Sequence, residues 1–393
     1  MLRSLKSLYH FIVAIAANVW FGSPGRNLTV IGVTGTDGKT TTTTLIYEIL
    51  KAAGLKTSMI TSVHAVIGGR EYDTGFHVTT PSAWWVQKYL REAADHGDTH
   101  VVLEVTSHAL SQSRVFGIHF AAAVITNVTH EHLDWHGTFE NYLRTKLQLL
   151  KYARVAVINR DTADVYNAAL PFLVRKRYLT YGIRRDSMVN PTTYPFKTAL
   201  PGEFNRYNIL AALGTAEALG IDRSVAAKAV ADFSGVVGRM EVVLEKPYRV
   251  IVDFAHTPNA IEQALRAVRA MTKKRVIHVF GSAGLRDHSK RPLMGKASAG
   301  YADVIILTEE DYRTENVNTI IDAIASGIPE GKEVYRHADR HDALVFALSI
   351  AKPDDIVIVT GKGHEKSLCR GTKEYPWSDE TEIHTIRKAL AKD

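Results

Sequence analysis

Apolar runs alternate with stretches of helical periodicity along the chain of 393 residues. In the first part of the chain, short apolar runs that predict buried strands lie at 28–33, 100–105, 122–126 and 155–159. Between these runs, apolar residues recur with helical spacing in segments such as 41–53 and 82–96. Buried strands separated by helices are typical of a mostly parallel sheet covered by helices. The pattern therefore predicts an α/β fold.

A second series of alternating elements follows the segment 233–239 (FSGVVGR), where two glycines interrupt the pattern. Its predicted strands are 249–254, 275–280, 303–307, 333–336 and 355–359, and its predicted helices are 258–271, 291–300, 318–325 and 340–350. This order predicts a doubly wound, Rossmann-like domain. We therefore expect an apolar helical segment over 1–26, a central domain over 27–237 and a C-terminal domain over 238–393.

The N-terminal segment places basic residues before an apolar stretch, as a signal peptide does. Its uninterrupted apolar part, 11–19, still contains Asn18 and is too short to span a bilayer. No small-residue cleavage site precedes the first strand. Two interpretations stay open: a first helix packed on the body of the protein, or an interfacial helix held at a membrane surface by Lys6, Trp20 and Phe21.

Charge and cysteine content narrow the class of partner. The formal charge is +7, but the 48 lysines and arginines are interspersed with 41 acids and form no basic run. This distribution favours a small phosphorylated substrate over nucleic acid, which usually binds to a basic stripe. A single cysteine, Cys369, excludes an internal disulfide. We therefore expect a cytoplasmic protein that binds no nucleic acid.

The segment 30–50 (VIGVTGTDGKTTTTTLIYEIL) combines a predicted strand, a glycine turn and a predicted helix. This arrangement binds polyphosphates, because backbone N–H groups and the start of the helix face the anion. Lys39 would reach the β and γ phosphates, and the Thr40 hydroxyl would bind Mg²⁺. The match to the Walker pattern is incomplete, since Val33 stands where the first glycine is expected. The central domain is thus predicted to be a P-loop domain.

Carboxylates and histidines follow two of the predicted strands. Glu104 ends the run VVLE and is the first expected Mg²⁺ ligand, because Mg²⁺ on a triphosphate needs a carboxylate from a neighbouring strand. The segment 126–136 (TNVTHEHLDWH) contains three histidines and several oxygen ligands at the same predicted sheet edge. A second Mg²⁺ site and a zinc site are both compatible with these residue types, although no HExxH or paired-cysteine spacing is present.

Eight motifs in a fixed order resemble the Mur ligase family, and most closely its MurE branch. They are 35–41 (GTDGKTT), 104–114 (EVTSHALSQSR), 126–136, 205–212 (NRYNILAA), 237–241 (VGRME), 252–258 (VDFAHTP), 279–294 (VFGSAGLRDHSKRPLM) and 361–365 (GKGHE). The resemblance covers about residues 27–393. It implies an ADP-forming ligase that adds the third amino acid to a muramoyl-dipeptide. In this chemistry ATP phosphorylates a carboxylate, and an amine then attacks the acyl phosphate.

The resemblance also implies roles for individual residues. The ATP phosphates would lie against Gly35, Thr36, Asp37, Gly38, Lys39, Thr40 and Thr41, and the rest of the nucleotide against Asn205, Asn208, Arg239, Asp253 and His256. The catalytic and metal positions would be Lys39, Thr40, Glu104, His132 and Lys146, with two Mg²⁺ ions. Lys146 matches a lysine that is carbamylated in this family, and a carbamate would attract Mg²⁺ where an ammonium would repel it. Glu131 stands where the family has aspartate.

Two further groups of residues match substrate positions of the family. The muramoyl-peptide would contact Thr79, Thr80, Thr106, Gln112 and Arg114, and the incoming amino acid would contact Arg286, Asp311, Arg313, Gly361 and Glu365. The family segment D-N-P-R, associated with diaminopimelate, reads EDYR over 310–313. Arg313 suits a distal carboxylate, whereas Asp311 suits a distal amine. Diaminopimelate has both groups, so we expect it rather than lysine.

The N-terminal segment is shorter than the domain with which the resembling ligases grip the uridine nucleotide. The acceptor is therefore expected either to bind through its peptide end alone or to be of another kind, such as a lipid-linked one. Ligases of the folylpolyglutamate type share the ATP machinery and are the main alternative. A non-catalytic member of the fold and a P-loop kinase or transport ATPase are weaker alternatives.

Overall fold

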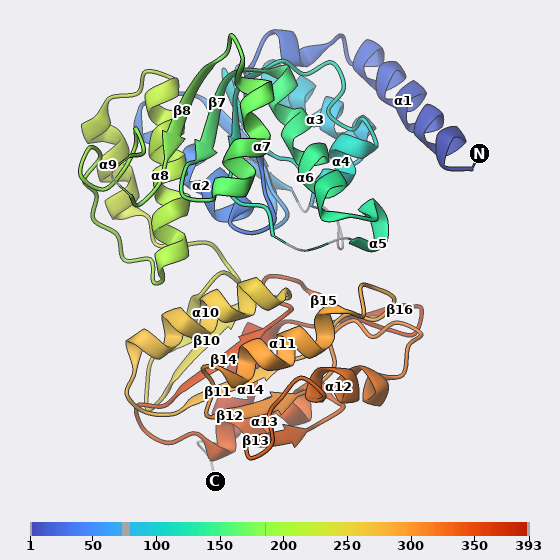
Figure 1. The fold of residues 1–393 in the computed structure, drawn as a ribbon, viewed down its shortest axis with the longest axis vertical. Coiled ribbons are helices and arrows are strands. Elements are labelled where there is room, and N and C mark those ends of the chain that lie inside the picture. The colour runs from blue at the N-terminus through green and yellow to red at the C-terminus, as the bar shows by residue number, and fades with distance from the viewer. Residues whose placement is uncertain (1, 73–78, 130, 132, 185, 391–393) are drawn as a thin grey trace. The chain divides into compact units, whose positions relative to one another are not determined.

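The computed structural model describes residues 2–72, 79–129, 131, 133–184 and 186–390. The chain divides into two compact units (Figure 1). The first comprises Met1–Leu200 with Phe204–Ser234, and the second comprises Pro201–Glu203 with Gly235–Asp393. Each unit contains its own sheet and its own apolar core.

The first unit is built on an eight-stranded sheet in the order β4-β3-β2-β5-β1-β6-β7-β8. The strands are β1 (Thr29–Thr34), β2 (Thr57–Ile60), β3 (Ala65–Ile67), β4 (Arg70–Tyr72), β5 (His100–Glu104), β6 (Phe120–Ile125), β7 (Ala153–Asn159) and β8 (Arg177–Tyr181). β1 lies between β5 and β6 and is parallel to both, and only the β2–β3–β4 edge is antiparallel. The predicted α/β class is confirmed, and so are the four predicted strands.

Helices cover the faces of this sheet (Figure 1). They are α1 (Leu2–Trp20), α2 (Lys39–Ala52), α3 (Ala83–Asp95), α4 (Ser107–Ser111), α5 (Leu133–His136), α6 (Phe139–Leu147), α7 (Ala163–Leu173), α8 (Glu203–Ala218) and α9 (Arg223–Asp232), with short 3₁₀ turns at Pro24–Arg26 and Gln148–Tyr152. The central strands are buried on both faces, as parallel strands between helices must be. No helix of the described residues is long and apolar enough to cross a membrane.

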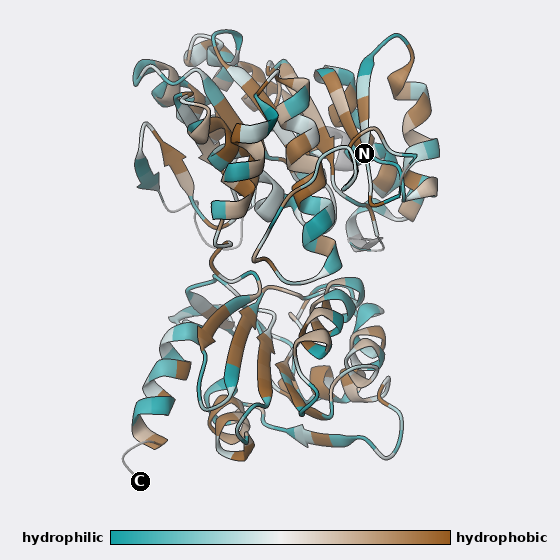
Figure 2. Ribbon diagram, turned by 90° about the vertical axis from the view of Figure 1, so that its left-hand side faces the viewer, coloured by the Kyte–Doolittle hydropathy of each residue, from teal (hydrophilic) through white to brown (hydrophobic). Residues whose placement is uncertain are grey.

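The second unit has a six-stranded sheet in the order β13-β12-β11-β14-β10-β9. Its strands are β9 (Glu241–Leu244), β10 (Arg249–Asp253), β11 (Val276–Phe280), β12 (Val304–Leu307), β13 (Glu333–Arg336) and β14 (Ile356–Thr360), and β15 (Ser367–Arg370) and β16 (Lys373–Pro376) form a separate hairpin. Among the described strands of the six-stranded sheet, only β9 is antiparallel to its neighbour. Figure 2 shows the apolar character of the central strands.

Five helices complete this unit: α10 (Pro258–Met271), α11 (Lys290–Ala299), α12 (Val317–Ala325), α13 (Arg340–Ile350) and α14 (Asp379–Leu390). Because β10, β11, β12 and β14 are parallel, the loops that follow them emerge at one edge of the sheet. These loops contain His256, which is expected to bind the nucleotide, and the five residues expected to bind the amino acid, Arg286, Asp311, Arg313, Gly361 and Glu365.

Candidate active site

The predicted phosphate loop connects β1 to α2 and has no room for side chains at its two glycines. A Cβ on Gly35 would lie 1.7 Å from the Thr126 hydroxyl oxygen. Gly38 has φ +78°, and a Cβ there would lie 2.2 Å from the Asn208 side-chain oxygen. Only glycine combines this backbone conformation with such close neighbours. The glycines are thus required by the segment after β6 and by α8, which pack against the loop.

The segment after β6 holds the loop through several hydrogen bonds. The Thr36 N–H donates to the Asn127 carbonyl, and the Asp37 N–H donates to the Asn127 side-chain oxygen, both at 2.8 Å. The Thr126 hydroxyl donates to the Asp37 carbonyl at 2.7 Å. Asn127 lies in the motif 126–136, but the sequence did not predict that it would hold the phosphate loop. Since these two loop amides have internal partners, the amides at the start of α2, which lack intrahelical acceptors, are the ones left to face an anion.

Oxygen ligands meet at the start of α2. The Thr40 hydroxyl donates to Glu104 Oε2 at 3.1 Å, and the Ser62 N–H donates to the same oxygen at 3.1 Å. The Ser62 and Thr40 hydroxyls are 3.0 Å apart. Glu104 is buried at the end of β5, the strand beside β1. A carboxylate and a hydroxyl beside a phosphate loop are suitable oxygen ligands for Mg²⁺, with the phosphates and water completing its coordination.

Two lysines approach the same loop. Lys39 Nζ donates to the Thr36 carbonyl at 2.7 Å. Lys146, on α6, is fully buried and donates to the Gly35 carbonyl at 2.6 Å. Burial, with a further contribution from the charge of Lys39, lowers the pKa of Lys146 well below its usual value. A neutral amine is the form that reacts with CO₂, and a carbamate nitrogen would keep one N–H for the Gly35 carbonyl. The site therefore fits the carbamate implied by the sequence resemblance.

The histidine-rich segment is only partly described. His132, the second expected metal ligand, lies outside the described residues. His136 Nε2 is 3.0 Å from the Ser107 hydroxyl, and its ring lies 5.9 Å from that of His108. Within the described ranges, no group of three or more histidine, cysteine, aspartate or glutamate residues is placed to hold a metal ion. The zinc interpretation stays a prediction, since His130 and His132 lie outside the described residues.

The residues expected to hold the muramoyl-peptide form one connected group beside Glu104. The Thr80 hydroxyl donates to the Glu104 carbonyl at 2.9 Å and accepts from the Thr106 N–H at 3.0 Å. The Thr106 hydroxyl caps α4 by accepting from the Ala109 N–H at 3.1 Å. Arg114 donates to the carbonyl of Thr80 and, at 2.7 Å, to Gln112. Thr79 precedes Thr80 in the same turn.

On the nucleotide side, α8 contributes two buried asparagines. The Asn208 amide donates to the Asn205 side-chain oxygen at 3.1 Å, and the Asn208 side-chain oxygen accepts from the Thr42 hydroxyl of α2 at 3.4 Å.

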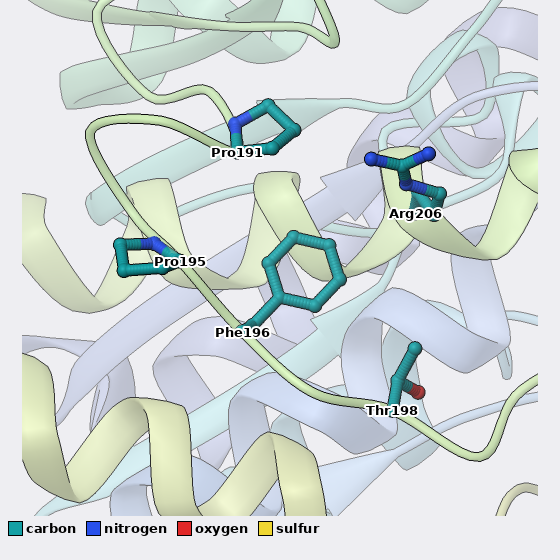
Figure 3. Close-up of a pocket in the computed structure, with 5 residues that line it drawn as sticks. All are labelled: Pro191, Pro195, Phe196, Thr198 and Arg206. Atoms are coloured by element: carbon teal, nitrogen blue, oxygen red, sulfur yellow. The ribbon is translucent and has the colours of Figure 1, made fainter.

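A pocket that the sequence did not predict lies beside the first turn of α8. It is lined by Pro191, Pro195, Phe196, Thr198 and Arg206 (Figure 3). The aromatic ring, the prolines and the guanidinium that line this open pocket are suited to binding a ligand with a flat ring system.

Three further expected nucleotide residues lie together in the second unit. Arg239 contacts His364 Nδ1 at 3.1 Å and stacks over the Phe254 ring at 4.4 Å. Asp253 accepts from the N–H groups of Met240 and Ala255, both at 2.8 Å, and burial raises its pKa. Asp253 thus holds the backbone around Arg239. The Nδ1 atom of His256 lies 2.8 Å from the carbonyl oxygen of Phe254.

Asp311 is placed differently from the sequence expectation. It is buried, and it accepts from Lys362 Nζ at 2.8 Å and from the Cys369 N–H at 2.9 Å. Lys362 is itself fully buried and also pairs with Glu365 at 2.5 Å. Burial alone would lower the pKa of Lys362, but Glu365 and Asp311 outweigh it and the pKa is raised. Because Lys362 balances the charge of Asp311, this carboxylate has no need of an amine from a substrate.

The neighbouring residues provide the other polar groups of this region. Arg313 has φ +53° and donates to the Gly284 carbonyl at 2.7 Å. Glu310 is buried, and its Oε2 has no hydrogen-bond partner among the described residues. A Cβ on Gly361, which has φ +106°, would lie 3.0 Å from that oxygen. Arg286 is exposed on the loop after β11. Glu310 is therefore a carboxylate that sequence reasoning passed over in favour of Asp311.

Comparison with known proteins identifies the family. Residues 33–216 match the Mur ligase middle domain, and residues 238–363 match the Mur ligase glutamate ligase domain. The UDP-N-acetylmuramoyl-L-alanyl-D-glutamate–2,6-diaminopimelate ligase of Aquifex aeolicus is 40% identical, over 94% of this chain and 80% of that protein. A solved structure of a ligase with the same description is 31% identical, with a TM-score of 0.63 over 93% of this chain and 79% of that one.

A more distant structure shares the fold alone. The Mycobacterium tuberculosis folylpolyglutamate synthase complexed with ADP has a TM-score of 0.71 over 100% of this chain and 97% of its own, at 19% identity. Two family models and relatives of at least 30% identity agree on the assignment. This chain belongs to the Mur ligase family of ATP-dependent, ADP-forming ligases.

Proposed function

We propose that the protein joins diaminopimelate to the D-glutamate of a UDP-N-acetylmuramoyl-dipeptide in peptidoglycan synthesis. The observation that carries this proposal is the 40% identity, over 94% of the chain, with a ligase named for that reaction. The glycine-bounded phosphate loop, with Thr40 and Glu104 beside it, supports the ATP-dependent activation of a carboxylate. The folylpolyglutamate alternative has the support of a shared fold only.

The residues of the phosphate loop suit both steps of the reaction. Lys39 is held by one loop carbonyl, which a phosphate oxygen can replace as its partner. We propose that Thr40, Glu104 and His132 hold Mg²⁺, which when bound neutralises charge on the phosphates and on the acyl phosphate. Buried amides and hydroxyls around the loop keep these groups in position.

We also propose that Lys146 acts as its carbamate. Its amine is buried against the loop and has a strongly lowered pKa, which favours the neutral form that CO₂ requires. Lys146 Nζ lies 2.6 Å from the Gly35 carbonyl oxygen. Conversion to a carbamate would therefore place a negative charge beside the phosphate loop, where cations are needed. The Tyr142 ring also lies against this amine, with its centroid 4.5 Å from Nζ.

For the amino acid, we propose that Arg313 binds the distal carboxylate and that Glu310 accepts from the distal ammonium of diaminopimelate. Both positions match or adjoin the pocket positions of the family. Glu310 Oε2 is buried without a partner, and such an acceptor is costly unless a ligand supplies a donor. Lysine would satisfy Glu310 but leave Arg313 without a carboxylate. The Asp311–Lys362 pair would act as support beneath these groups.

We place the enzyme in the cytoplasm and propose that residues 1–22 contact a membrane surface. A lipid-linked acceptor is compatible with that location and is kept as the alternative to the UDP-linked one. The contact is expected to be peripheral, because α1 is an amphipathic helix and does not have the length and hydropathy of a span.

Phosphate release tests the proposal. The purified chain is given ATP, Mg²⁺ and UDP-N-acetylmuramoyl-L-alanyl-D-glutamate, with diaminopimelate, lysine or no amino acid. We expect release that requires both the acceptor and diaminopimelate, with a heavier product by mass spectrometry. Release with lysine alone would overturn the assignment of the amino acid. Release with a folate and glutamate instead would overturn the assignment of the acceptor.

A further inference from the structure

Helix α1 leaves an apolar stripe uncovered on the first unit. Leu8, Ile12, Ile15 and Val19 follow the spacing i, i+4, i+7 and i+11, so they share one face of the helix. The exposed fractions of Leu8, Ile12 and Val19 are 56%, 55% and 69%. An isolated exposed apolar residue needs no explanation, but a contiguous row along one helix marks an interaction site.

The other side of α1 is held against the body of the first unit. Ala14 and Ala17 are buried, and the Phe11 ring packs on Phe116 with centroids 5.2 Å apart. Phe21, just after the helix, packs on Trp84 of α3 at 5.0 Å. The stripe is therefore presented by a docked helix, as Figure 1 shows at the margin of the first unit. One side of α1 thus packs on the body, and the other side is free to contact an outside partner.

Two tryptophans of α3 extend the stripe. The Trp20 ring lies 6.0 Å from that of Trp84, and Trp20 is 74% exposed. Trp85 is also exposed, and the Lys88 ammonium lies 4.5 Å from its ring centroid. Tryptophan with a nearby cation is the combination favoured at the boundary between lipid and water. We call these residues of α1 and α3 the apolar surface: Leu8, Ile12, Ile15, Val19, Trp20, Trp84 and Trp85.

The cation beside the tryptophans of the apolar surface, Lys88, favours an anionic partner. The sequence of α1 contains Arg3, Lys6 and His10 and no acid. The acids on α3 have partners, since Glu92 accepts from the Tyr72 hydroxyl and Asp95 pairs with Arg91 at 2.6 Å. A second copy of the chain, packed through the same face, would bring the Lys88 ammonium groups of both copies into one interface. Anionic lipid headgroups would instead be attracted to them.

We propose that the apolar surface docks on a membrane leaflet that contains anionic lipid, with α1 lying in the interface and Trp84 and Trp85 beside it. This inference deepens the membrane contact proposed above, and it adds α3 as a second contact element. It does not depend on which amino acid the enzyme adds. Docking would hold the ligase at the membrane surface through its first unit.

Vesicle flotation of the full chain tests the proposal. Vesicles of phosphatidylcholine alone are compared with vesicles that also contain phosphatidylglycerol. We expect binding to the second kind, reduced by high salt. The variant Ile12→Ser/Val19→Ser and the variant Trp85→Ser should each bind about tenfold less, because each loses exposed apolar area that lipid would cover. Leu170→Ser/Val174→Ser removes exposed apolar residues elsewhere on the first unit and should bind normally.

Ligase activity on a soluble acceptor is measured for the same proteins, and it should be unchanged in all three variants. This separates a failure of the membrane inference from a failure of the proposed reaction. Equal binding of the wild-type chain to vesicles with and without phosphatidylglycerol would overturn the lipid assignment, as would no binding at all. Dimerisation that is lost in the Ile12→Ser/Val19→Ser variant would identify a second copy as the occupant.

Discussion

Lys146 illustrates how burial determines the chemistry available to a single side chain. In solution a lysine amine is protonated at neutral pH and does not react with CO₂. Inside the first unit, burial lowers the pKa of Lys146, and its Nζ is fixed 2.6 Å from the Gly35 carbonyl. The same residue type at Lys151, five positions along, is exposed and keeps no comparable contact with the loop.

Replacing Lys146 by alanine is expected to lower kcat by about 100-fold or more, because an anion that supports the metal is lost. If the carbamate is the active form, a small added carboxylate should restore part of the activity. Lys151→Ala is the matched control and should behave as the wild type. The measurement is phosphate release with and without added formate or acetate. Absence of any rescue from a folded variant would contradict the carbamate role.

Asp311 and Arg313 are two residues apart but are expected to act differently. Asp311→Asn should lower the free energy of unfolding by about 2 kcal/mol, because Lys362 keeps only Glu365 as a counter-charge. The preference for diaminopimelate over lysine should not change.

Arg313→Gln should raise KM for diaminopimelate about tenfold and leave KM for lysine nearly unchanged. Thermal unfolding and steady-state kinetics with both amino acids measure these effects. A gain in preference for diaminopimelate in Asp311→Asn would show that Asp311 itself reads the substrate.

At the scale of the element, α2 owes its form to what surrounds it. Its first turns contain five successive threonines, which are weak helix formers because they are β-branched. They are tolerated because the first four are buried, with Thr40 bonded to Glu104 of β5 and Thr42 to Asn208 of α8, and because the Thr44 hydroxyl returns a hydrogen bond to the Thr40 carbonyl at 2.9 Å. Burial in the tertiary structure outweighs local propensity here.

The two ends of α2 permit a matched comparison of two glycines, Gly38 before the helix and Gly54 after it. Gly38 and Gly54 have φ values of +78° and +77°, but a Cβ on Gly54 would meet nothing within 4 Å. Gly54→Ala should therefore cost only the strain of the left-handed conformation, about 1 kcal/mol. Gly38→Ala adds the clash with Asn208 and should cost about 3 kcal/mol, with loss of ATP binding. Denaturant unfolding and ATP titration measure both. Equal costs would mean that Asn208 moves aside freely.

At the scale of the whole molecule, buried ion pairs make stability depend on pH. Arg291, buried in the second unit, holds Glu315 through bonds of 2.6 and 2.9 Å. The hydrogen bonds from Arg291 lower the pKa of Glu315 from 4.5 to about 2. Folding lowers the pKa of this carboxyl, so the ionised group stabilises the protein at pH values above its pKa in the unfolded chain. This contribution is lost as the pH falls through its pKa in the folded protein.

Glu315→Gln should therefore destabilise the protein by about 2 kcal/mol at neutral pH, since a charged hydrogen-bonded pair is replaced by a neutral one. The difference from the wild type should shrink below pH 4.5 and vanish near pH 2. Calorimetric unfolding across this range checks the expectation. A difference that does not change with pH would show that the loss comes from packing and not from the charge.

The sequence by itself determined the features that depend on neighbours along the chain. The apolar runs predicted the buried parallel strands, and two helices of the second unit, Pro258–Met271 and Arg340–Ile350, have the predicted bounds. The phosphate loop and the family motifs were also recognisable, because the glycines, Lys39 and Thr40 act within one short segment. The antiparallel edge β2–β3–β4 was missed, because strands of three or four residues carry too little periodicity to be distinguished from loops.

Tertiary structure alone decided which polar groups find partners inside the protein. The sequence placed Asp311 at a substrate position, but Lys362, which lies 51 residues further along the chain, balances its charge. Glu310 Oε2 next to it has no hydrogen-bond partner among the described residues, and Ser62 joined the phosphate site from outside the motifs. The physical reason is that a charge or a hydrogen bond is satisfied by whatever the fold brings within about 3 Å, and sequence distance does not predict this.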